Sequence, residues 1–405
     1  MEFEVLILGS DANAYYMARC CYEEYHKKAY LIAPFGMPYT SYSNILNISY
    51  NKNFWEEKEF LKTLKEFKLK HNNLPIILIS TNETYTTLIA KNKDILSKDY
   101  LFNYPDISIV ETLSKKDKFY TTYNNMGLTI PKSIIYDCSN AKNCEIPFSF
   151  PLIIKPCNVI EYNHIEFSGK KKIYKIKNKK ELKTILENIK KGGYQDEIII
   201  QEFIMGDDSC LFDSVVYVDK NYNVSFITFA QIGLQERSSS MVGNAAVLIN
   251  GYNQFGKEDE EIAKIKKFME KIKYQGFAEV DLKYDIVEKK FKVLEINPRQ
   301  GRCSYYVKAL GYNLVKVLVD DLLLNKSIEY QVLKEEVLLS FVPRRVALKY
   351  ITNFHYKKKL LSMWKKNKIV KPLNCKEDKN MKRKLFLIKR YFKYFKLYKN
   401  SYWKE

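Results

Sequence analysis

Two neighbouring runs of alternating apolar residues constrain the fold of this chain most strongly. Residues 276–284 read GFAEVDLKY, and residues 292–297 read KVLEIN after a short charged turn. The alternation predicts two antiparallel strands. Asp281 and Glu295 lie on these strands, and Asn297 shares the face of Glu295 because side chains two residues apart on a strand point the same way. We therefore expect two carboxylates and an amide on one face of a sheet.

Oxygen ligands of this kind suit a hard divalent cation. Mg²⁺ takes carboxylate and carbonyl oxygens, keeps several waters and bridges to substrate phosphates. Pro298 stops the strand directly after Asn297, and Arg299 then faces the same site. A guanidinium there can hold a phosphate or a reacting carboxyl group through two hydrogen bonds. The sequence predicts an ATP–Mg²⁺ site, and a plain polar strand end is the alternative for these residues taken alone.

The size and composition of the chain indicate a globular protein of two or three domains. A chain of 405 residues is too long for a single small domain, and a hydrophobic content of 46% is ordinary for a folded chain. We find no run of about 20 apolar residues, which a membrane helix needs, and no secretory signal before the first strand. The eight cysteines are scattered without a Cys-x-x-Cys pair, which favours reduced thiols. We expect a cytoplasmic protein.

The net charge of +20 suggests an anionic partner. Basic residues gather at Lys170–Lys180 and again from Lys357 to Lys404, where aromatic residues are interleaved with lysine. Nucleic acid, an acidic membrane surface and polyanionic cell-wall material are all compatible with such a segment. A solvated helix face is the alternative that requires no partner.

The first 110 or so residues alternate between predicted strands and helices. Apolar runs at residues 3–8, 29–33 and 75–80 are separated by helical segments, and the helix after the third run begins near Thr81 or Asn82. This alternation predicts parallel strands in a three-layer α/β domain. The turn at residues 9–11 follows the first strand but lacks the full dinucleotide glycine pattern, so we do not expect NAD here.

The central region mixes helices with strands that pair locally. The predicted elements are a helix at 113–127, strands at 148–156 and 197–204, a hairpin of strands 215–218 and 224–228, and a helix at 305–324. We find no internal repeat. These elements predict an α+β region after the first domain.

Two lysines are candidate phosphate ligands. Lys155 ends an apolar strand directly before a proline, where an ammonium can reach nucleotide phosphates as a point charge. Lys116, on the preceding helix, is a weaker candidate. A surface lysine is the alternative for either residue alone.

The segment 201–208 has the form of a strand that leads into a hinge. Backbone groups of Glu202 and Ile204 can bind the edge of adenine, and the Gln201 side chain can bind its amino group. Asp208 can accept from the ribose hydroxyls. An ordinary strand and turn is the alternative.

The residues after Arg299 offer further charge. Residues 300–305 open the next predicted helix, whose N–H groups and Arg302 can hold an anion. Cys303 has no evident basic partner, so we interpret it as a small packing residue. The polar loop 235–244 either lines the acceptor side of a cleft or is mobile.

Taken in order, these motifs resemble the ATP-grasp superfamily. The similarity covers nearly the whole chain and is greatest to the D-aspartate ligase group of carboxylate–amine ligases. The family-like stretches are residues 8–19, 201–209, 276–278 and 295–305, together with the basic aromatic tail. The resemblance implies an ATP-grasp fold, with an N-terminal pre-ATP-grasp α/β domain at 1–110, an ATP-grasp domain at 111–328 with a lid at about 150–200, and a basic C-terminal extension at 329–405.

The resemblance assigns a role to each matching residue. It implies that ATP is held at its phosphates by Lys116 and Lys155, at its adenine by Gln201, Glu202 and Ile204, and at its ribose by Asp208. It implies that two Mg²⁺ ions are ligated by Asp281, Glu295 and Asn297. It also implies that Arg299 with Arg302 stabilises an acyl-phosphate and the tetrahedral state. One departure concerns the lid, because residues 158–162 replace the glycine-rich phosphate loop of many relatives. We expect residues 167–170 to serve as the mobile cover instead.

The implied activity is ATP-dependent amide formation on a cell-wall precursor. In the resembled ligases the acid is the side-chain carboxyl of D-aspartate, and the acceptor is the lysine ε-amino group of a peptidoglycan stem peptide. The alternatives are the same chemistry on another amino acid or amine, and a non-catalytic protein that binds polyanions through its tail. We expect no nucleic-acid partner. The tail would bring the enzyme to the anionic inner face of the cell membrane.

Overall fold

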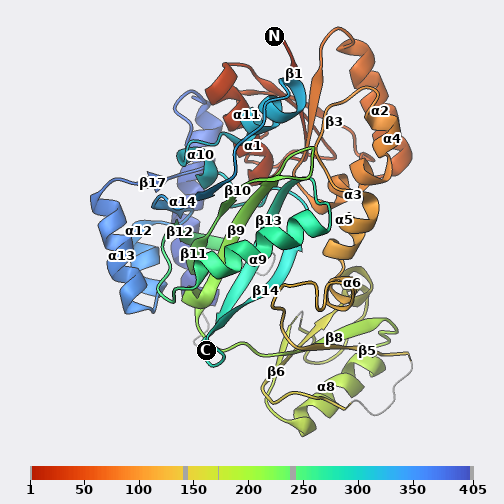
Figure 1. The fold of residues 1–405 in the computed structure, drawn as a ribbon, viewed down its shortest axis with the longest axis vertical. Coiled ribbons are helices and arrows are strands. Elements are labelled where there is room, and N and C mark those ends of the chain that lie inside the picture. Colours follow the sequence, from red (N-terminus) through yellow and green to blue (C-terminus); the bar gives the residue numbers. More distant parts are fainter. Residues whose placement is uncertain (1, 140–144, 172, 238–242, 402–405) are drawn as a thin grey trace.

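The computed structural model describes residues 2–139, 145–171, 173–237 and 243–401, and within them the strands form three sheets (Figure 1). The N-terminal sheet has the order β3–β2–β1–β4 and is parallel throughout. Its strands are Leu46–Tyr50 (β3), Ala29–Ala33 (β2), Glu4–Leu8 (β1) and Ile76–Ser80 (β4). The predicted parallel α/β arrangement is confirmed.

Helices cover both faces of this sheet. Alternate residues of β1 enter different cores: Ile7 packs in a core with residues of α1 (Ala12–Tyr25), whereas Leu8 packs in a core with residues of α2 (Glu57–Lys70). Such burial on both faces explains why the predicted strands are continuous apolar runs. The helices α3 (Glu83–Lys91) and α4 (Lys93–Leu96) follow β4.

The turn between β1 and α1 depends on glycine. Gly9 has φ +119°, and a Cβ there would lie 2.1 Å from the Thr81 hydroxyl oxygen. Only glycine combines this conformation with this close approach. Asp11 then caps α1 by accepting from the Ala14 N–H at 3.0 Å, and Asn82 caps α3 in the same way.

The largest sheet carries the two runs that opened the sequence. Its strands follow the order β14–β13–β9–β11–β12–β16–β17, with β10 pairing with β9 and β15. The bounds are β9 Leu211–Val218, β10 Val224–Thr228, β11 Ala230–Gln235, β12 Ala245–Asn250, β13 Gly276–Asp285 and β14 Lys290–Asn297. β13 and β14 are antiparallel neighbours, which confirms that prediction.

A small sheet with its own core lies at the far end of the molecule from the N-terminal sheet (Figure 1). It has the order β5–β8–β6–β7, with strands Ser133–Asp137 (β5), Glu197–Glu202 (β8), Leu152–Pro156 (β6) and Tyr174–Ile176 (β7). The helices α7 (Val159–His164) and α8 (Lys179–Lys191) belong to the same region. Ile198 and Ile200 pack in this core, whereas Ile199 faces the core of the large sheet.

Two predicted helices are wrong in length. The helix expected at 113–127 is divided into α5 (Ile107–Ser114) and α6 (Lys116–Thr122) by Lys115, whose backbone is extended. The helix expected at 305–324 is divided into α10 (Tyr306–Ala309), α11 (Leu314–Leu318) and a π-helical turn at Val319–Leu323. Gly311 has φ +94° and breaks this run, since a left-handed residue cannot continue a helix.

The C-terminal region joins the large sheet. Its strands are β15 (Gln331–Leu333), β16 (Val337–Ser340) and β17 (Ile369–Val370), and its helices are α12 (Arg344–Tyr350), α13 (Phe354–Lys365) and α14 (Met381–Ser401). Among the described residues, no helix has the length and apolar character that crossing a bilayer requires. The division of the chain near residues 110 and 328 stays a prediction.

The helix α9 (Glu258–Lys271) packs on the large sheet and buries a carboxyl group. Glu261 is 2% exposed, and its Oε2 lies 3.4 Å from the Lys264 ammonium. Burial raises the pKa of Glu261 to about 7, and Lys264 offsets this only in part. The unfolded chain loses the proton near the ordinary pKa of 4.5, so folding becomes less favourable as the pH rises from there to about 7.

The variant Glu261→Gln should therefore be more stable than the parent at pH 8 and little changed at pH 5. The gain at pH 8 is at most about 3 kcal/mol, because the neutral amide avoids burying a charge. Thermal unfolding at the two pH values measures it, with the exposed neighbour Glu260→Gln as control. An equal effect of Glu261→Gln at both pH values would contradict the assignment.

Candidate active site

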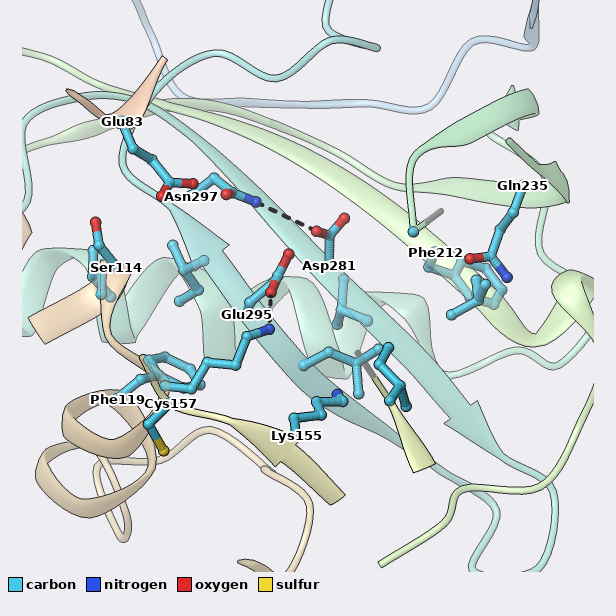
Figure 2. Close-up of a pocket in the computed structure, with 18 of the residues that line it drawn as sticks. Glu83, Ser114, Phe119, Lys155, Cys157, Phe212, Gln235, Asp281, Glu295 and Asn297 are labelled. Atoms are coloured by element: carbon cyan, nitrogen blue, oxygen red, sulfur yellow. Dashed lines mark hydrogen bonds and ion pairs between the residues drawn. The ribbon is translucent and has the colours of Figure 1, made fainter. Parts of the chain in front are cut away.

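A cavity of about 420 Å³ lies where the small sheet, the helix α6 and the large sheet meet. This volume falls in the range of small-molecule sites. Its polar lining includes Lys116, Lys155, Gln235, Asp281, Glu295 and Asn297. Figure 2 shows Asp281 and Glu295 pointing into it from β13 and β14, with Lys155 approaching from β6. Five of the residues singled out in the sequence thus share one cavity.

The strand register brings the predicted metal ligands together. Asp281 and Glu295 are direct partners across β13 and β14, and the Asn297 amide nitrogen lies 3.4 Å from an Asp281 oxygen. Burial raises the pKa of Asp281 well above its ordinary value, and Glu279, Glu295 and Asp213 raise it further. Crowded carboxylates of this kind are relieved by a bound cation. The donor set therefore fits Mg²⁺.

Lys116 and Glu295 form an ion pair of 2.7 Å between the ammonium nitrogen and Oε2. Lys116 lowers the pKa of Glu295 to about 2, although burial opposes the shift. Burial lowers the pKa of Lys116, but Glu295, Tyr120 and Asp281 together exceed that effect and raise it. The lysine is therefore charged and held next to the carboxylates. Lys155 also lowers the pKa of Glu295, so both lysines act on one carboxylate.

Two further carboxylates at this site were missed in the sequence. Asp213 on β9 is the register partner of Asp281, and its Oδ1 accepts from the Tyr306 hydroxyl at 2.9 Å. Burial raises the pKa of Asp213 well above its ordinary value, and the nearby Glu279 adds to this. Glu279 lies two residues before Asp281, so the alternation along the strand could have found it. Nothing in the local sequence of Asp213 distinguishes it.

Arg299 stands at the edge of these carboxylates. Its guanidinium nitrogens lie 3.7 Å from Glu83 and 3.8 Å from Glu279, and one of them donates to the Gln300 carbonyl. Its buried Nε has no hydrogen-bond partner among the described residues. Burial lowers the pKa of Arg299, but Glu279 and Glu83 outweigh that effect and raise it. The residue is a fixed cation with donor capacity left for a substrate anion.

Arg302 is placed differently. It donates to the Glu236 carboxylate at 2.6 Å, and its guanidinium lies 4.2 Å above the Phe341 ring. Its Nε and Nη1 are buried without a hydrogen-bond partner in the part of the chain that the structure describes. Neither Arg299 nor Arg302 is among the residues that line the cavity. Burial raises the pKa of Asp11, which caps α1, while Arg299 and Arg302 both lower it, so the two arginines approach the same carboxyl group.

The residues predicted to bind adenine lie on β8 and just after it, outside the cavity lining. The Gln201 amide donates to the Ser133 hydroxyl at 2.9 Å. The Glu202 carboxylate accepts from the buried Lys292 ammonium at 2.6 Å, and the Glu202 N–H donates to the Lys132 carbonyl. Ile204 is 6% exposed. Glu202 thus ties the small sheet to the hairpin of β13 and β14.

The Asp208 side chain bonds to residues at the end of β11, and it also lies outside the cavity lining. Its carboxylate accepts from the Gln235 N–H at 2.9 Å, from the Gln235 amide at 2.7 Å and from Arg237 at 2.8 Å. Gln235 itself lines the cavity. The structure therefore joins Asp208 to the site through a neighbouring side chain.

Parts of three expectations fall outside the described residues. In the polar loop 235–244, residues 238–242 are not described, nor are Lys172 of the first basic stretch and residues 402–405 of the tail. Residues 158–162, which replace the glycine-rich loop, form the start of α7. The expected cover at 167–170 contains a left-handed Gly169, and its motion stays a prediction.

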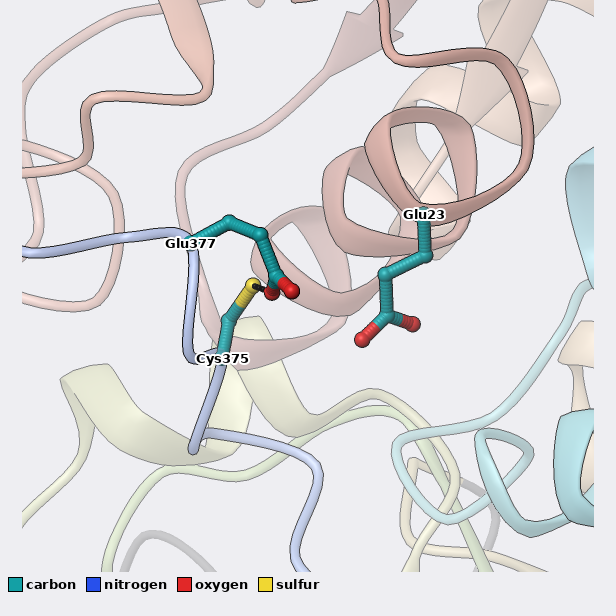
Figure 3. Close-up of side chains that lie close together, drawn as sticks. All are labelled: Glu23, Cys375 and Glu377. Carbon is teal, nitrogen blue, oxygen red and sulfur yellow. Dashed lines mark hydrogen bonds between the residues drawn. The ribbon is translucent and has the colours of Figure 1, made fainter.

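A separate group of Glu23, Cys375 and Glu377 brings metal-type ligands within 4.8 Å of one another (Figure 3). Glu23, however, already accepts from Arg19, Lys308 and Tyr305. The Cys375 thiol donates to Glu377 at 3.1 Å. Arg19 also donates to the Lys371 and Pro372 carbonyls, so we interpret this group as part of a structural contact between α1 and the C-terminal region. Cys303 is 3% exposed and burial raises its pKa, which agrees with a packing role.

Comparison with proteins of known function identifies the family. No model of a known protein family matches the chain. The chain is 32% identical to a D-aspartate ligase of Enterococcus faecium (strain Aus0004) over 413 aligned residues, which cover 97% of each protein.

Solved structures share the fold at low sequence identity. One is an L-amino acid ligase from Bacillus licheniformis, with a TM-score of 0.55, 16% identity and coverage of 79% of this chain and 74% of that chain. Another is an N5-carboxyaminoimidazole synthetase from Staphylococcus aureus complexed with ADP, with a TM-score of 0.58, 15% identity and coverage of 84% and 82%. The extent of the match to the enterococcal enzyme shows that the chain belongs to the D-aspartate ligase family and is an ATP-dependent carbon–nitrogen ligase with the ATP-grasp fold.

Proposed function

We propose that this enzyme activates the side-chain carboxyl of D-aspartate with ATP and joins it to the lysine ε-amino group of a peptidoglycan stem peptide. The observation that carries the chemistry is the cavity that Lys116, Lys155, Asp281 and Glu295 line together. The D-aspartate ligase family suggests the acid. A non-catalytic polyanion-binding protein, the alternative from the sequence, does not require such a site.

The residues of the cavity suggest how the reaction proceeds. Lys116 and Lys155 present two ammonium groups to the phosphates of ATP, and Asp281, Glu295 and Asn297 would hold two Mg²⁺ ions. When bound there, Mg²⁺ would supply positive charge that offsets the charge of the phosphates. The carboxylate of the amino acid attacks the γ-phosphorus, so that ADP leaves and an acyl-phosphate forms. Gln201, Glu202 and Ile204 bind adenine and Asp208 binds ribose in this proposal.

Amide formation completes the reaction. The neutral amine attacks the acyl carbon, the tetrahedral intermediate collapses, phosphate leaves and the amine proton passes to solvent or phosphate. Arg299 stabilises the oxyanion and the leaving phosphate, and Arg302 assists it. Residues 167–170 cover the site during the reaction and exclude water, which would hydrolyse the acyl-phosphate.

An assay of ADP release tests this proposal. The enzyme is supplied with ATP, Mg²⁺ and a stem peptide whose lysine has a free ε-amino group. D-aspartate, L-aspartate, D-glutamate, D-alanine or glycine is then added in turn. We expect turnover that needs both the acid and the peptide and is fastest with D-aspartate. Faster turnover with another acid would favour the alternative of a different amino-acid ligase. Absence of turnover with every pair would overturn the proposal.

The outward face of α14 supports a peripheral contact with an anionic membrane. Met381, Leu385, Ile388 and Phe392 follow helical spacing and are 66%, 54%, 45% and 65% exposed. Lysines at 382, 384, 389, 393 and 396 flank this stripe. An apolar stripe bordered by lysine is typical of helices that lie in the headgroup region of anionic bilayers.

Co-sedimentation with vesicles tests this contact. We expect binding to vesicles that contain phosphatidylglycerol, weaker binding to phosphatidylcholine alone, and loss of most binding at high salt. Phe392→Ser should weaken binding about fivefold or more, whereas Phe354→Ser, a change at an equally exposed aromatic residue on α13, should not. Binding that is absent, or insensitive to salt and to Phe392→Ser, would contradict the contact.

A further inference from the structure

The inner face of α14 packs against the large sheet next to the candidate active site. Tyr394 and Tyr398 are 4% and 0% exposed and pack in one core with Leu234 of β11 and Val247 of β12. The same helix therefore has an exposed basic and apolar side and a buried aromatic side. The buried side has no part in membrane contact, so it requires a separate explanation.

This buried side contacts the residues that end β11. The Tyr398 hydroxyl donates to the Gln235 carbonyl at 2.5 Å, and the Tyr394 hydroxyl donates to a Glu236 carboxylate oxygen at 2.9 Å. The Arg390 guanidinium lies 3.8 Å from the same Glu236 oxygen and donates to the Tyr394 hydroxyl. Glu236 is 1% exposed, so protein groups rather than water surround its carboxylate.

Glu236 connects the helix to Arg302, which the proposed function assigns to the activated acid. The Glu236 oxygen that accepts from Tyr394 also accepts from Arg302 at 2.6 Å. A buried carboxylate shared between an arginine and a tyrosine is fixed in position, because each charge-assisted bond restricts its rotamer. The residues on either side of Glu236 contact the proposed ribose ligand, because Gln235 and Arg237 both donate hydrogen bonds to Asp208.

α14 is itself fixed at its first half to the N-terminal domain. Arg383 donates to Asp378 at 2.9 Å and stacks 3.6 Å from the Tyr15 ring, and the Tyr15 hydroxyl donates to Asp378 at 3.0 Å. Farther along, Arg390 donates to the Tyr39 hydroxyl at 2.6 Å. The helix thus spans from the N-terminal domain to the end of β11, and Arg302 lies at the end of the chain of contacts.

We infer that α14 is a positioning element of the active site, in which Tyr394 and Arg390 hold Glu236 so that Arg302 is fixed for the amino-acid substrate. The inference rests on the proposed function, because Arg302 is assigned there to the activated acid. Arg302 stands away from the cavity that holds Lys116 and Lys155. Disturbing it should therefore affect use of the amino acid far more than use of ATP.

Steady-state kinetics of Tyr394→Phe in the full-length enzyme test the inference, with D-aspartate or whichever acid the parent enzyme turns over in the panel. The change removes one hydroxyl and keeps the buried ring. We expect KM for the amino acid to rise about three- to tenfold, which matches the net contribution of one typical hydrogen bond, with KM for ATP unchanged. Arg390→Lys, which keeps the charge, should act in the same direction. Tyr391→Phe, on the exposed side of the helix, is the matched control and should behave as the parent.

The possible outcomes separate the two proposals. A rise in KM for the amino acid alone, in either variant but not in the control, supports the positioning role. Unchanged kinetics in Tyr394→Phe and Arg390→Lys, or an equal rise in both KM values with a lower melting temperature, would overturn it. Absence of turnover in the parent enzyme would instead count against the proposed function itself.

Discussion

Replacing Glu295 by glutamine should reduce turnover by at least about 1000-fold and leave the fold intact. The amide removes the negative charge with which Glu295 would balance a bound Mg²⁺, and such an ion contributes several kcal/mol to transfer of a phosphoryl group. The change also removes the ionic partner of Lys116, whose ammonium lies 2.7 Å from the carboxylate. Both side chains are more than a third exposed, so the pair contributes only about 0–1 kcal/mol to stability.

Turnover of Glu295→Gln is measured by ADP release, and its fold by circular dichroism and thermal unfolding. Glu288→Gln is a matched control, because Glu288 also bonds to lysines on the same hairpin but lies away from the cavity. The control should keep near-parental activity. Near-normal turnover in Glu295→Gln would refute the assignment of Glu295 to the metal site.

Arg299→Lys should lower kcat by roughly 100- to 1000-fold, in line with loss of a donor to a developing oxyanion. Lysine keeps the positive charge near Glu83 and Glu279, so the buried Glu279 carboxylate remains compensated and the protein should fold. It lacks the planar pair of donors with which a guanidinium holds a phosphate or carboxylate. The lost interaction is therefore one made with the reacting group.

Single-turnover kinetics measure the chemical step of Arg299→Lys, and nucleotide binding is followed separately by fluorescence titration. ATP affinity should change less than threefold, because the lysines of the cavity hold the phosphates in our proposal. Arg345→Lys, at an exposed residue of α12, is the control and should leave the rate of the chemical step and the ATP affinity unchanged. A chemical step at the parental rate in Arg299→Lys would show that Arg299 does not contact the reacting group.

Local sequence pattern was enough to predict much of the fold. The strands β1, β2 and β4 are apolar runs bounded by turn residues, and the pairing of β13 with β14 follows from two alternating runs with a short turn between them. The predicted helices failed where one backbone conformation interrupts a helical pattern. Gly311 could have marked one of these breaks, whereas Lys115 is an ordinary helix former whose extended backbone is set by the surrounding structure.

The site was predictable only where its residues lie close in sequence. Asp281, Glu295 and Asn297 belong to one hairpin, so their spacing places them on one face. Asp213 reaches the site through the pairing of β9 with β13, which links residues about 70 positions apart and leaves no local signal. The same holds for Tyr394, because its contact with Glu236 spans 158 positions. Composition identified the tail as basic and aromatic but could not separate its buried side from its exposed one.

Mass spectrometry of the reaction product tests the central claim most directly. The enzyme is incubated with ATP, Mg²⁺, a stem peptide and D-aspartate, and the product is fragmented to locate the new amide. We predict a peptide that has gained one aspartyl residue on its lysine ε-amino group, linked through the side-chain carboxyl. A peptide of unchanged mass after incubation with D-aspartate, with ADP released only when another acid is supplied, would contradict the account.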